Sequence, residues 1–286
     1  VLILIGLCIY GIFFTSGGVK AINFLFKPDF SKLTGEGVLS ALGHAFFTLS
    51  LGMGAMITYG SYLKKDVDLP KAAFTVSILD TVIALFAGIA IFSIVFEYNG
   101  QVAGGPGLIF ETLPILFKEI GPAISVPFFL LLTFAALTSG ISLLEVVVSY
   151  FIDEKQWSRF KSTLLLGGAI YLVGILSAVD SWKLPFMGKK QSFFDIFDFI
   201  TTNYMLPVVG LLTSLFVAWV IKEKIRIEGF KLLRDGAEVP TLSNQFYLPW
   251  KYVLRFVSPV AVLIIILHGF GFLNKILAYF GFHISS

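Results

Sequence analysis

The stretch HAFFTLSLGMGAMITYGSY, residues 44–62, decides the fold of this chain. It is apolar enough to lie in a lipid bilayer, yet its middle, Thr48–Gly54, carries two glycines and two hydroxyl groups where a spanning helix usually has leucines. Glycine weakens a helix by about 1 kcal/mol relative to alanine, and hydroxyl groups can replace lost backbone partners. One interpretation is a helix broken in the membrane, whose freed backbone groups hold an ion or a zwitterion. The other is a packing motif, because small residues let helices approach closely.

The composition indicates an integral membrane protein. Of the residues, 57% are apolar, 16% aromatic and 14% charged, and the mean hydropathy is +0.89. The single cysteine, Cys8, lies in an apolar run, so we expect a core residue and neither a disulfide framework nor a thiolate metal site. No basic stripe interleaved with aromatic residues suggests nucleic acid. No HExxH, no GxSxG with a triad in reach and no phosphate loop is present, so we expect no enzyme.

Seven hydrophobic segments are long enough to cross about 30 Å of hydrocarbon at about 1.5 Å per residue. They cover roughly residues 1–17, 38–62, 72–97, 123–152, 161–179, 194–221 and 250–268. A shorter apolar piece, 107–119, predicts an external helical hairpin, and 269–286 predicts a short amphipathic external tail. Val1 lies inside a hydrophobic run, so we expect a truncation point within a spanning helix and no signal peptide. We therefore expect one transmembrane domain fragment over 1–286.

Lysine and arginine residues predict the orientation of these segments. The connections 62–71, 153–161 and 222–235, together with Lys251 and Arg255, hold 13 of the 21 basic residues. The other eight lie on the opposite side. By the positive-inside rule the first set is cytoplasmic, and the first segment runs from inside to outside.

Polar residues inside the spanning segments are the candidates for chemistry. Asp80, in FTVSILDTVIALFAG, must be protonated, paired with a lysine or bound to a cation, and a cation or proton site is the favoured interpretation. In the fourth segment Thr138 and Ser139 adjoin small residues, so hydroxyl and backbone oxygens could converge on a hard cation such as sodium. The alternative is that these hydroxyls bond to carbonyl groups of their own helix.

Four motifs in series, FFTLSLGMGAMITYGSY, LDTVIALFAGIAIF, GLIFETLPILF and AALTSGISLLEVVVSYF, resemble the bacterial branch of the neurotransmitter:sodium symporter family over essentially all 286 residues. The resemblance implies an all-α integral membrane protein, a partial inverted-repeat bundle of the leucine-transporter type with seven transmembrane helices, one of them broken. The chain would cover the fifth to eleventh helices of that fold. The first four helices, which complete the sites in the family, would be the missing partner.

The resemblance also implies the roles of individual residues. Substrate-binding positions would be Phe46, Phe47, Thr48, Ser50, Met53, Ser139 and Leu143. Thr48 would also bind a first sodium together with Asp80, and a second sodium would take the Ala135 carbonyl and the hydroxyls of Thr138 and Ser139. Asp198 would be the external gate acid, Asp153 the internal one, and Tyr62 would support the inner gate. By the residues alone, both acids could equally be solvated helix ends.

Three departures from the family pattern refine these expectations. Asp80 stands where many members have asparagine, and Ala84 where chloride-dependent members have serine. Two unit charges 4 Å apart interact by about 4 kcal/mol at an effective dielectric constant of 20, so a fixed carboxylate can replace chloride, and we expect no chloride requirement. His44 replaces a glutamine, either as a neutral hydrogen-bonding substitute, which is favoured, or as a pH-sensitive group. Met53 replaces a phenylalanine and can yield to large side chains.

The predicted function is therefore sodium-coupled symport of a neutral, hydrophobic or aromatic amino acid by alternating access. The protein would be a multi-pass component of the cytoplasmic membrane, in contact with lipid, using Na⁺ and binding no nucleic acid. A sodium-independent exchanger of related fold and a non-transporting amino acid sensor remain alternatives. A channel is disfavoured because no filter loop or pore-lining polar stripe is evident.

Overall fold

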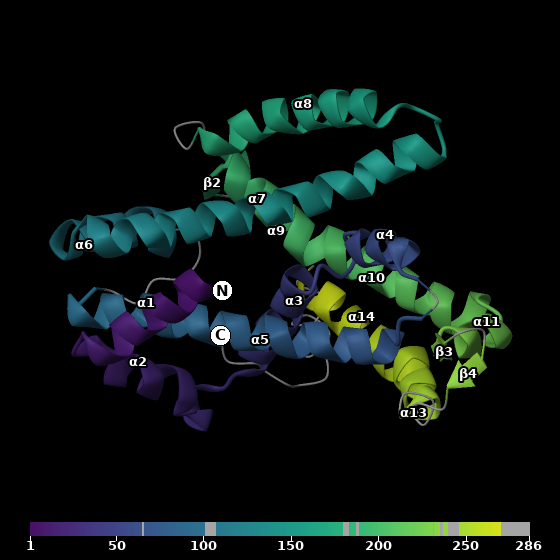
Figure 1. Ribbon diagram of the computed structural model, residues 1–286, viewed down its shortest axis with the longest axis horizontal. Helices are drawn as coiled ribbons and strands as arrows, with labels where there is room; N and C mark the ends of the chain where they lie inside the picture. The colour runs from purple at the N-terminus through teal and green to yellow at the C-terminus, as the bar shows by residue number, and fades with distance from the viewer. Residues whose placement is uncertain are drawn as a thin grey trace. The chain divides into compact units, whose positions relative to one another are not determined.

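The computed structural model describes residues 1–64, 66–100, 107–179, 183–186, 189–230, 232–234, 237–239 and 246–269. These residues are mostly helical, with two short antiparallel hairpins (Figure 1). The chain divides into two compact units, one formed by 1–32 and 75–141, the other by 33–74 and 142–286. Each unit is described by itself below. The predicted tail, 269–286, lies outside the described residues from position 270 onward.

The first unit contains two helices joined by a sharp corner, followed by the long helices that pack on them. Its elements are α1 (Leu2–Phe13), α2 (Gly17–Phe26), the 3₁₀ turn η1 (Phe30–Lys32), most of α5 (Leu69–Glu97), the π-helical turn η2 (Leu108–Thr112), α6 (Leu113–Ile120) and the first part of α7 (Pro122–Asp153). The axis bends by 110° between α1 and α2. The first predicted segment, roughly 1–17, corresponds to α1, which ends at Phe13, and to the corner that follows it.

A carboxylate far away in the sequence explains this corner. Glu97 Oε2, at the end of α5, accepts hydrogen bonds from the Ser16 amide at 2.6 Å, the Ser16 hydroxyl at 2.7 Å and the Gly17 amide at 3.0 Å. A negative charge at a helix start satisfies free amide groups and complements the helix dipole. Gly17 also lies so close to the Ser93 carbonyl that a side chain would not fit there.

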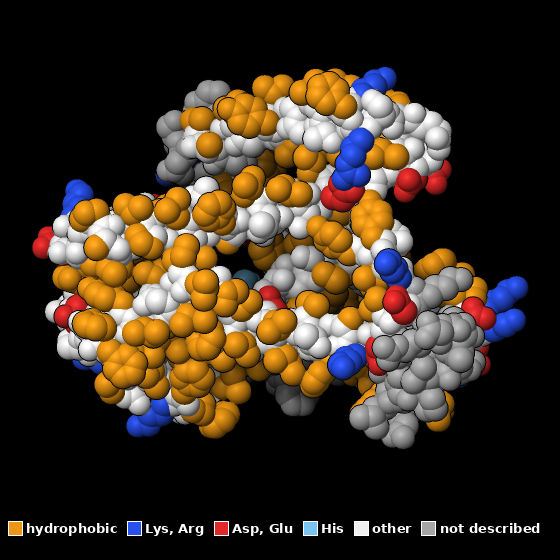
Figure 2. All heavy atoms as spheres, viewed as in Figure 1, with side chains coloured by type: hydrophobic (Ala, Val, Ile, Leu, Met, Phe, Trp, Pro, Cys, Tyr) orange, Lys and Arg blue, Asp and Glu red, His pale blue; other side chains and the backbone are white. Residues whose placement is uncertain are grey.

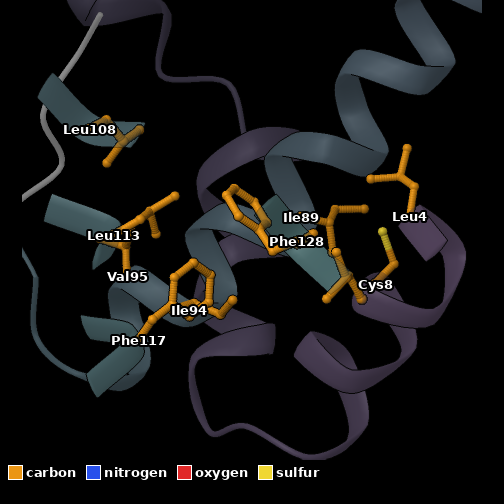
Figure 3. Packing of buried hydrophobic residues seen from close by; sticks show 11 residues of the cluster. Leu4, Cys8, Ile89, Ile94, Val95, Leu108, Leu113, Phe117 and Phe128 are labelled. Carbon is orange, nitrogen blue, oxygen red and sulfur yellow. The ribbon is translucent and has the colours of Figure 1, made fainter. Parts of the chain in front are cut away.

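The core of the first unit joins α1, α5, α6 and α7 (Figure 3). Leu4 and Cys8 of α1 pack with Ile89 and Ile94 of α5, so Cys8 is a core residue as expected. Its thiol donates a hydrogen bond to the Phe86 carbonyl at 3.0 Å. Phe117 of α6 and Phe128 of α7 extend the cluster, with ring centroids 5.1 Å apart.

The second unit contains the broken segment and the remaining helices. Its elements are α3 (Gly35–Thr48), α4 (Ala55–Tyr62), the last part of α7, α8 (Arg159–Ala178), β1 (Lys183–Phe186), β2 (Lys189–Ser192), α9 (Phe193–Ile200), η3 (Thr201–Met205), α10 (Leu206–Leu215), η4 (Phe216–Val220), α11 (Glu223–Glu228), β3 (Leu232–Arg234), β4 (Ala237–Val239), α13 (Tyr247–Tyr252), η5 (Val253–Val257) and α14 (Ser258–Gly269). The elements η3, η4 and η5 are π-helical turns inside longer helices. α10 packs against α14, and α3 contacts both.

Five helices among the described residues are long and apolar enough to cross a membrane: Leu69–Glu97, Pro122–Asp153, Arg159–Ala178, Phe193–Val220 and Tyr247–Leu267. They correspond to five of the seven predicted segments. The other two are interrupted, the first at the α1–α2 corner and the second between α3 and α4. Hydrophobic side chains cover most of the face shown in Figure 2, and charged side chains gather mainly near helix ends. This distribution is that of a multi-pass membrane protein.

Candidate functional site: the helix break and its surroundings

The predicted break lies between Thr48, the last residue of α3, and Ala55, the first residue of α4. Thr34 caps the start of α3, where its hydroxyl accepts a hydrogen bond from the Gly37 amide at 3.0 Å. Just after the end of α3, the Leu51 amide donates a hydrogen bond to the Phe46 carbonyl of that helix at 2.8 Å. Gly54 brings no side-chain cap to α4, so the first amides of that helix keep the free donors of any helix start. Six residues therefore separate the carbonyl end of α3 from the amide end of α4.

Three residues in the break adopt a left-handed backbone conformation. They are Ser50 with φ 54°, Gly52 with φ 78° and Gly54 with φ 81°. A side chain on Gly52 would collide with the Leu206 carbonyl of α10, and one on Gly54 would come within 2.9 Å of Val146 of α7. The glycines are thus required both for the turn and for close packing. A left-handed serine costs free energy that the packing around it must offset, and such residues cluster at functional sites.

The predicted substrate residues of α3 point in different directions. Phe46 is buried in the core of the second unit with Leu206 and Val262. Phe47, the next residue, is 48% exposed, and its ring stacks with His44 at 6.4 Å between centroids. Thr48 is exposed, whereas Met53 is half-buried against the Phe46 core. The exposed face of the broken segment is therefore formed by Phe47 and Thr48 and not by Phe46.

A cavity of about 360 Å³ adjoins the break on its other side. Ser50, Gly52 and Gly54 line it from the break, and the remaining lining comes from α3, α4, α10, η4, α13, η5 and α14. Of the predicted substrate residues, Phe46 and Ser50 line this cavity. Its walls are mainly apolar.

The predicted sodium ligands Asp80, Ala135, Thr138 and Ser139 belong to the first unit. Asp80 is half-buried in the middle of α5. On α7 the Thr138 hydroxyl donates a hydrogen bond to the Ala135 carbonyl at 2.9 Å. This is the back-bonding that the sequence left open as an alternative.

A polar network ties the far end of α4 to α7 and α8 in the second unit. The Tyr62 hydroxyl donates to Glu145 Oε1 at 2.8 Å, and Arg159, at the start of α8, pairs with Glu145 Oε2 at 2.5 Å. One turn earlier, the Tyr59 hydroxyl donates to the Ser142 hydroxyl at 2.7 Å. The sequence predicted Tyr62 but missed Glu145, Arg159 and Tyr59 as its companions. The sequence does contain one signal for this network: Glu145 is a carboxylate inside a spanning segment, and such a group usually has a polar or basic partner.

The two predicted gate acids lie on exposed helix ends. Asp153 is the last residue of α7, and its carbonyl accepts a hydrogen bond from the Gln156 amide group at 2.8 Å. Asp198 of α9 accepts one from the Thr202 hydroxyl at 3.3 Å. Leu143, predicted to line the substrate pocket, is exposed on α7 in the second unit. Among the described residues, no group of three or more His, Cys, Asp and Glu side chains could hold a metal ion.

Comparisons with known proteins show which family the chain belongs to. Residues 1–282 match the model of the sodium:neurotransmitter symporter family. An uncharacterized sodium-dependent transporter of Bacillus subtilis (strain 168), YhdH, is 36% identical over 264 residues, which cover 91% of this chain and 57% of that protein. An uncharacterized sodium-dependent transporter of Haemophilus influenzae is 33% identical over 255 residues, covering 87% and 53%.

A solved structure is similar over nearly the whole chain. The crystal structure of MhsT in complex with L-phenylalanine matches with a TM-score of 0.77 and 40% sequence identity, covering 94% of this chain and 60% of that one. The chain thus spans a little over half the length of the relatives it matches.

Proposed function

Because the chain belongs to the sodium:neurotransmitter symporter family, we propose that the protein carries a neutral amino acid across the membrane together with sodium, by alternating access. The observation that carries the proposal is the break between Thr48 and Ala55. Helix ends in the membrane interior present carbonyls to a cation and amides to a carboxylate, which are the charged parts of a sodium ion and an amino acid. The family is one of transporters, so no enzymatic activity follows.

The substrate groups of this proposal are side chains of the broken segment and of α7. Thr48 would bind both the amino acid and the first sodium, and Phe47 would cover the bound substrate. The exposure of both side chains supports these roles, because neither is consumed by the core of its own unit. Ser50, Met53, Ser139 and Leu143 would line the side-chain pocket, as the family resemblance implies. Phe46 would support Phe47 from the core rather than touch the substrate.

The sodium groups of this proposal are oxygen atoms. Asp80 would balance the charge of the first sodium. The Ala135 carbonyl and the hydroxyls of Thr138 and Ser139 would bind the second, as the family resemblance implies. Oxygen donors of this kind suit hard cations. A carboxylate at position 80 makes chloride unnecessary in this proposal.

The proposed substrate class is hydrophobic or aromatic amino acids. Met53 is flexible and polarizable, so the pocket can adapt to a large side chain. The similar protein MhsT was crystallised with L-phenylalanine. Competition by the twenty amino acids against sodium-dependent binding of labelled phenylalanine would rank the substrates, and preference for a small polar amino acid would contradict this class.

The test of the function is uptake by the full-length protein in proteoliposomes. Radiolabelled amino acid should accumulate above its external concentration only when an inward sodium gradient is imposed. Equal exchange with and without sodium would instead identify a sodium-independent exchanger. Saturable binding without any accumulation would identify a sensor.

A further inference from the structure

An arginine lies over a tryptophan ring where the last described helix begins. Arg255 of η5 has its guanidinium carbon 4.2 Å from the centre of the Trp219 ring of η4. Both residues belong to the second unit. Trp219 lies three residues before the connection 222–246 and Arg255 nine residues after it. This connection is rich in basic residues, and the lysine and arginine distribution assigns it to the cytoplasmic side. A cation inside a spanning helix requires a physical reason.

The residues that the structure describes leave this arginine without a hydrogen-bond partner. Arg255 Nε is buried and has no hydrogen-bond partner in the described part of the chain, and no carboxylate there pairs with the side chain. Glu223, an acid of this corner, is bonded to Lys251. Arg226 donates from Nη1 to the Val217 and Ala218 carbonyls, although its Nε, like that of Arg255, has no hydrogen-bond partner among the described residues. Within the described part of the chain, Arg255 is thus left with donors for a further anion.

A row of exposed aromatic rings adjoins Arg255. Trp219 is 55% exposed, Phe256 53% and Tyr252 60%. Phe256 packs edge-on to Trp219 at 6.2 Å and stacks with Tyr252 at 6.5 Å between centroids. Tryptophan and tyrosine side chains favour the level of the lipid headgroups, with an apolar body toward the acyl chains. A guanidinium beside such a row would lie at the level of the lipid phosphates.

We propose that Arg255, supported by the Trp219 ring, binds the phosphate of an anionic phospholipid in the cytoplasmic leaflet. A guanidinium group matches the geometry of a phosphate with two parallel hydrogen bonds, which an ammonium group cannot provide. The acyl chains would lie along the exposed apolar side chains Phe216, Val253 and Val257. Lys222 and Lys224, which directly follow the helix end, add positive charge and favour an anionic headgroup over a zwitterionic one.

The test measures lipid retention by the full-length protein. The purified transporter is titrated with phosphatidylglycerol or with phosphatidylcholine, and bound lipid is counted by native mass spectrometry. R255Q should weaken phosphatidylglycerol binding about fivefold, as expected for one lost basic group, and should leave phosphatidylcholine binding unchanged. R255K, which keeps the charge but loses the paired donors, should fall between wild type and R255Q. Elution as a single sharp peak in size-exclusion chromatography shows that each variant is folded.

The matched control is Lys161, which lies over Trp157 at 4.4 Å on the same predicted side of the membrane. K161Q removes a similar cation from a similar ring and should leave phosphatidylglycerol binding as in the wild type. Equal retention by R255Q and wild type would overturn the proposal, as would equal losses in R255Q and K161Q. Displacement of the lipid by millimolar inorganic phosphate would overturn the assignment to a phospholipid and identify a free-phosphate site.

Discussion

Gly52 is constrained both by its backbone conformation and by its packing. Its φ of 78° is a conformation that residues with a side chain rarely adopt, and the Leu206 carbonyl occupies the space where a Cβ would lie. Ser50, two residues earlier, takes a similar conformation at φ 54° although it carries a side chain. The two residues turn the chain between α3 and α4, so the two helices do not form one continuous helix. The break therefore results from left-handed backbone conformations as well as from the low helix propensity of its glycines.

Gly52→Ala is expected to lower the free energy of unfolding by about 2–4 kcal/mol, through backbone strain and displacement of α10. Thermal unfolding of the purified full-length protein measures this. The control is Gly168→Ala in α8, where a Cβ meets no atom within 4 Å. There the substitution should be neutral or stabilise by about 0.5–1 kcal/mol, because alanine favours helix. A Gly52 variant as stable as the Gly168 variant would show that the close contact with α10 is not needed.

A second single residue, Asp80, is the basis of the prediction that uptake does not require chloride. Uptake by the full-length protein should persist when gluconate replaces chloride, because the carboxylate supplies the negative charge near sodium. Asp80→Asn should raise the sodium concentration for half-maximal uptake about tenfold or more, given the size of a close charge interaction. The control, Asp29→Asn, removes an exposed acid paired with Lys32 and should change neither quantity. Loss of wild-type uptake in gluconate would contradict this role.

Among the elements, α4, α7 and α8 are joined at one end by the hydroxyl and charge network of Tyr59, Tyr62, Ser142, Glu145 and Arg159. The two tyrosines are three residues apart on α4, and their acceptors are three residues apart on α7. Residues at this spacing share a helix face. The two helices are therefore held in one register along a single edge, and α8 is connected to that edge through Arg159.

Because Arg159 acts through the carboxylate of Glu145, the stability losses caused by replacing these two residues should not add. Glu145→Gln and Arg159→Gln should each lower the melting temperature of the full-length protein, and the double variant should melt no lower than the less stable single variant. Tyr59→Phe, which leaves the carboxylate untouched, should add its own decrement to Arg159→Gln. Additive losses for Glu145 and Arg159 would mean that the ion pair does not form in the membrane.

The contact between α11 and α13 predicts a dependence on pH. The hydrogen bond from Lys251 holds the pKa of the Glu223 carboxyl below its ordinary value of 4.5. A carboxyl whose pKa is lowered by folding stabilises the protein above its ordinary pKa and loses that contribution as the pH falls through the lowered value. The melting temperatures of wild type and Glu223→Gln should therefore differ at pH 7 and converge as the pH falls below the ordinary pKa of 4.5 and through the lowered one. Glu228→Gln in the same helix is the control, and a difference that grows on acidification would contradict the assignment.

For the molecule as a whole, the two compact units divide the proposed ligands between them. Asp80, Ala135, Thr138 and Ser139 belong to the first unit, whereas Phe47, Thr48, Met53 and Leu143 belong to the second. Each unit has its own buried cluster, one around Ile94 and Phe117, the other around Phe46 and Val262. Each set of ligands is therefore supported by a separate core.

The orientation of the whole molecule is also testable. In a background without other cysteines, including Cys8→Ser, a cysteine at Glu154 should resist membrane-impermeant maleimide added to intact cells. A cysteine at Lys27 should react, because the charge distribution puts it outside. Both should react after the cells are permeabilised. Labelling of position 154 in intact cells would reverse the orientation and with it the leaflet assigned to Arg255.

The sequence by itself determined the membrane class, the approximate position of most spans and the break between α3 and α4. Hydropathy and glycine content act locally, so a window of neighbouring residues contains the information. It could not show that the first span ends at Phe13, because the corner depends on Glu97, which lies 81 residues beyond Ser16. It could not separate Phe46 from Phe47 either, since a segment that is apolar on all sides does not mark its buried face.

Only the tertiary structure decided which of these residues faces the core, which carboxylate caps α2 and which arginine meets Glu145. These are contacts between segments far apart in the chain, and their energies depend on distance and burial rather than on residue type alone.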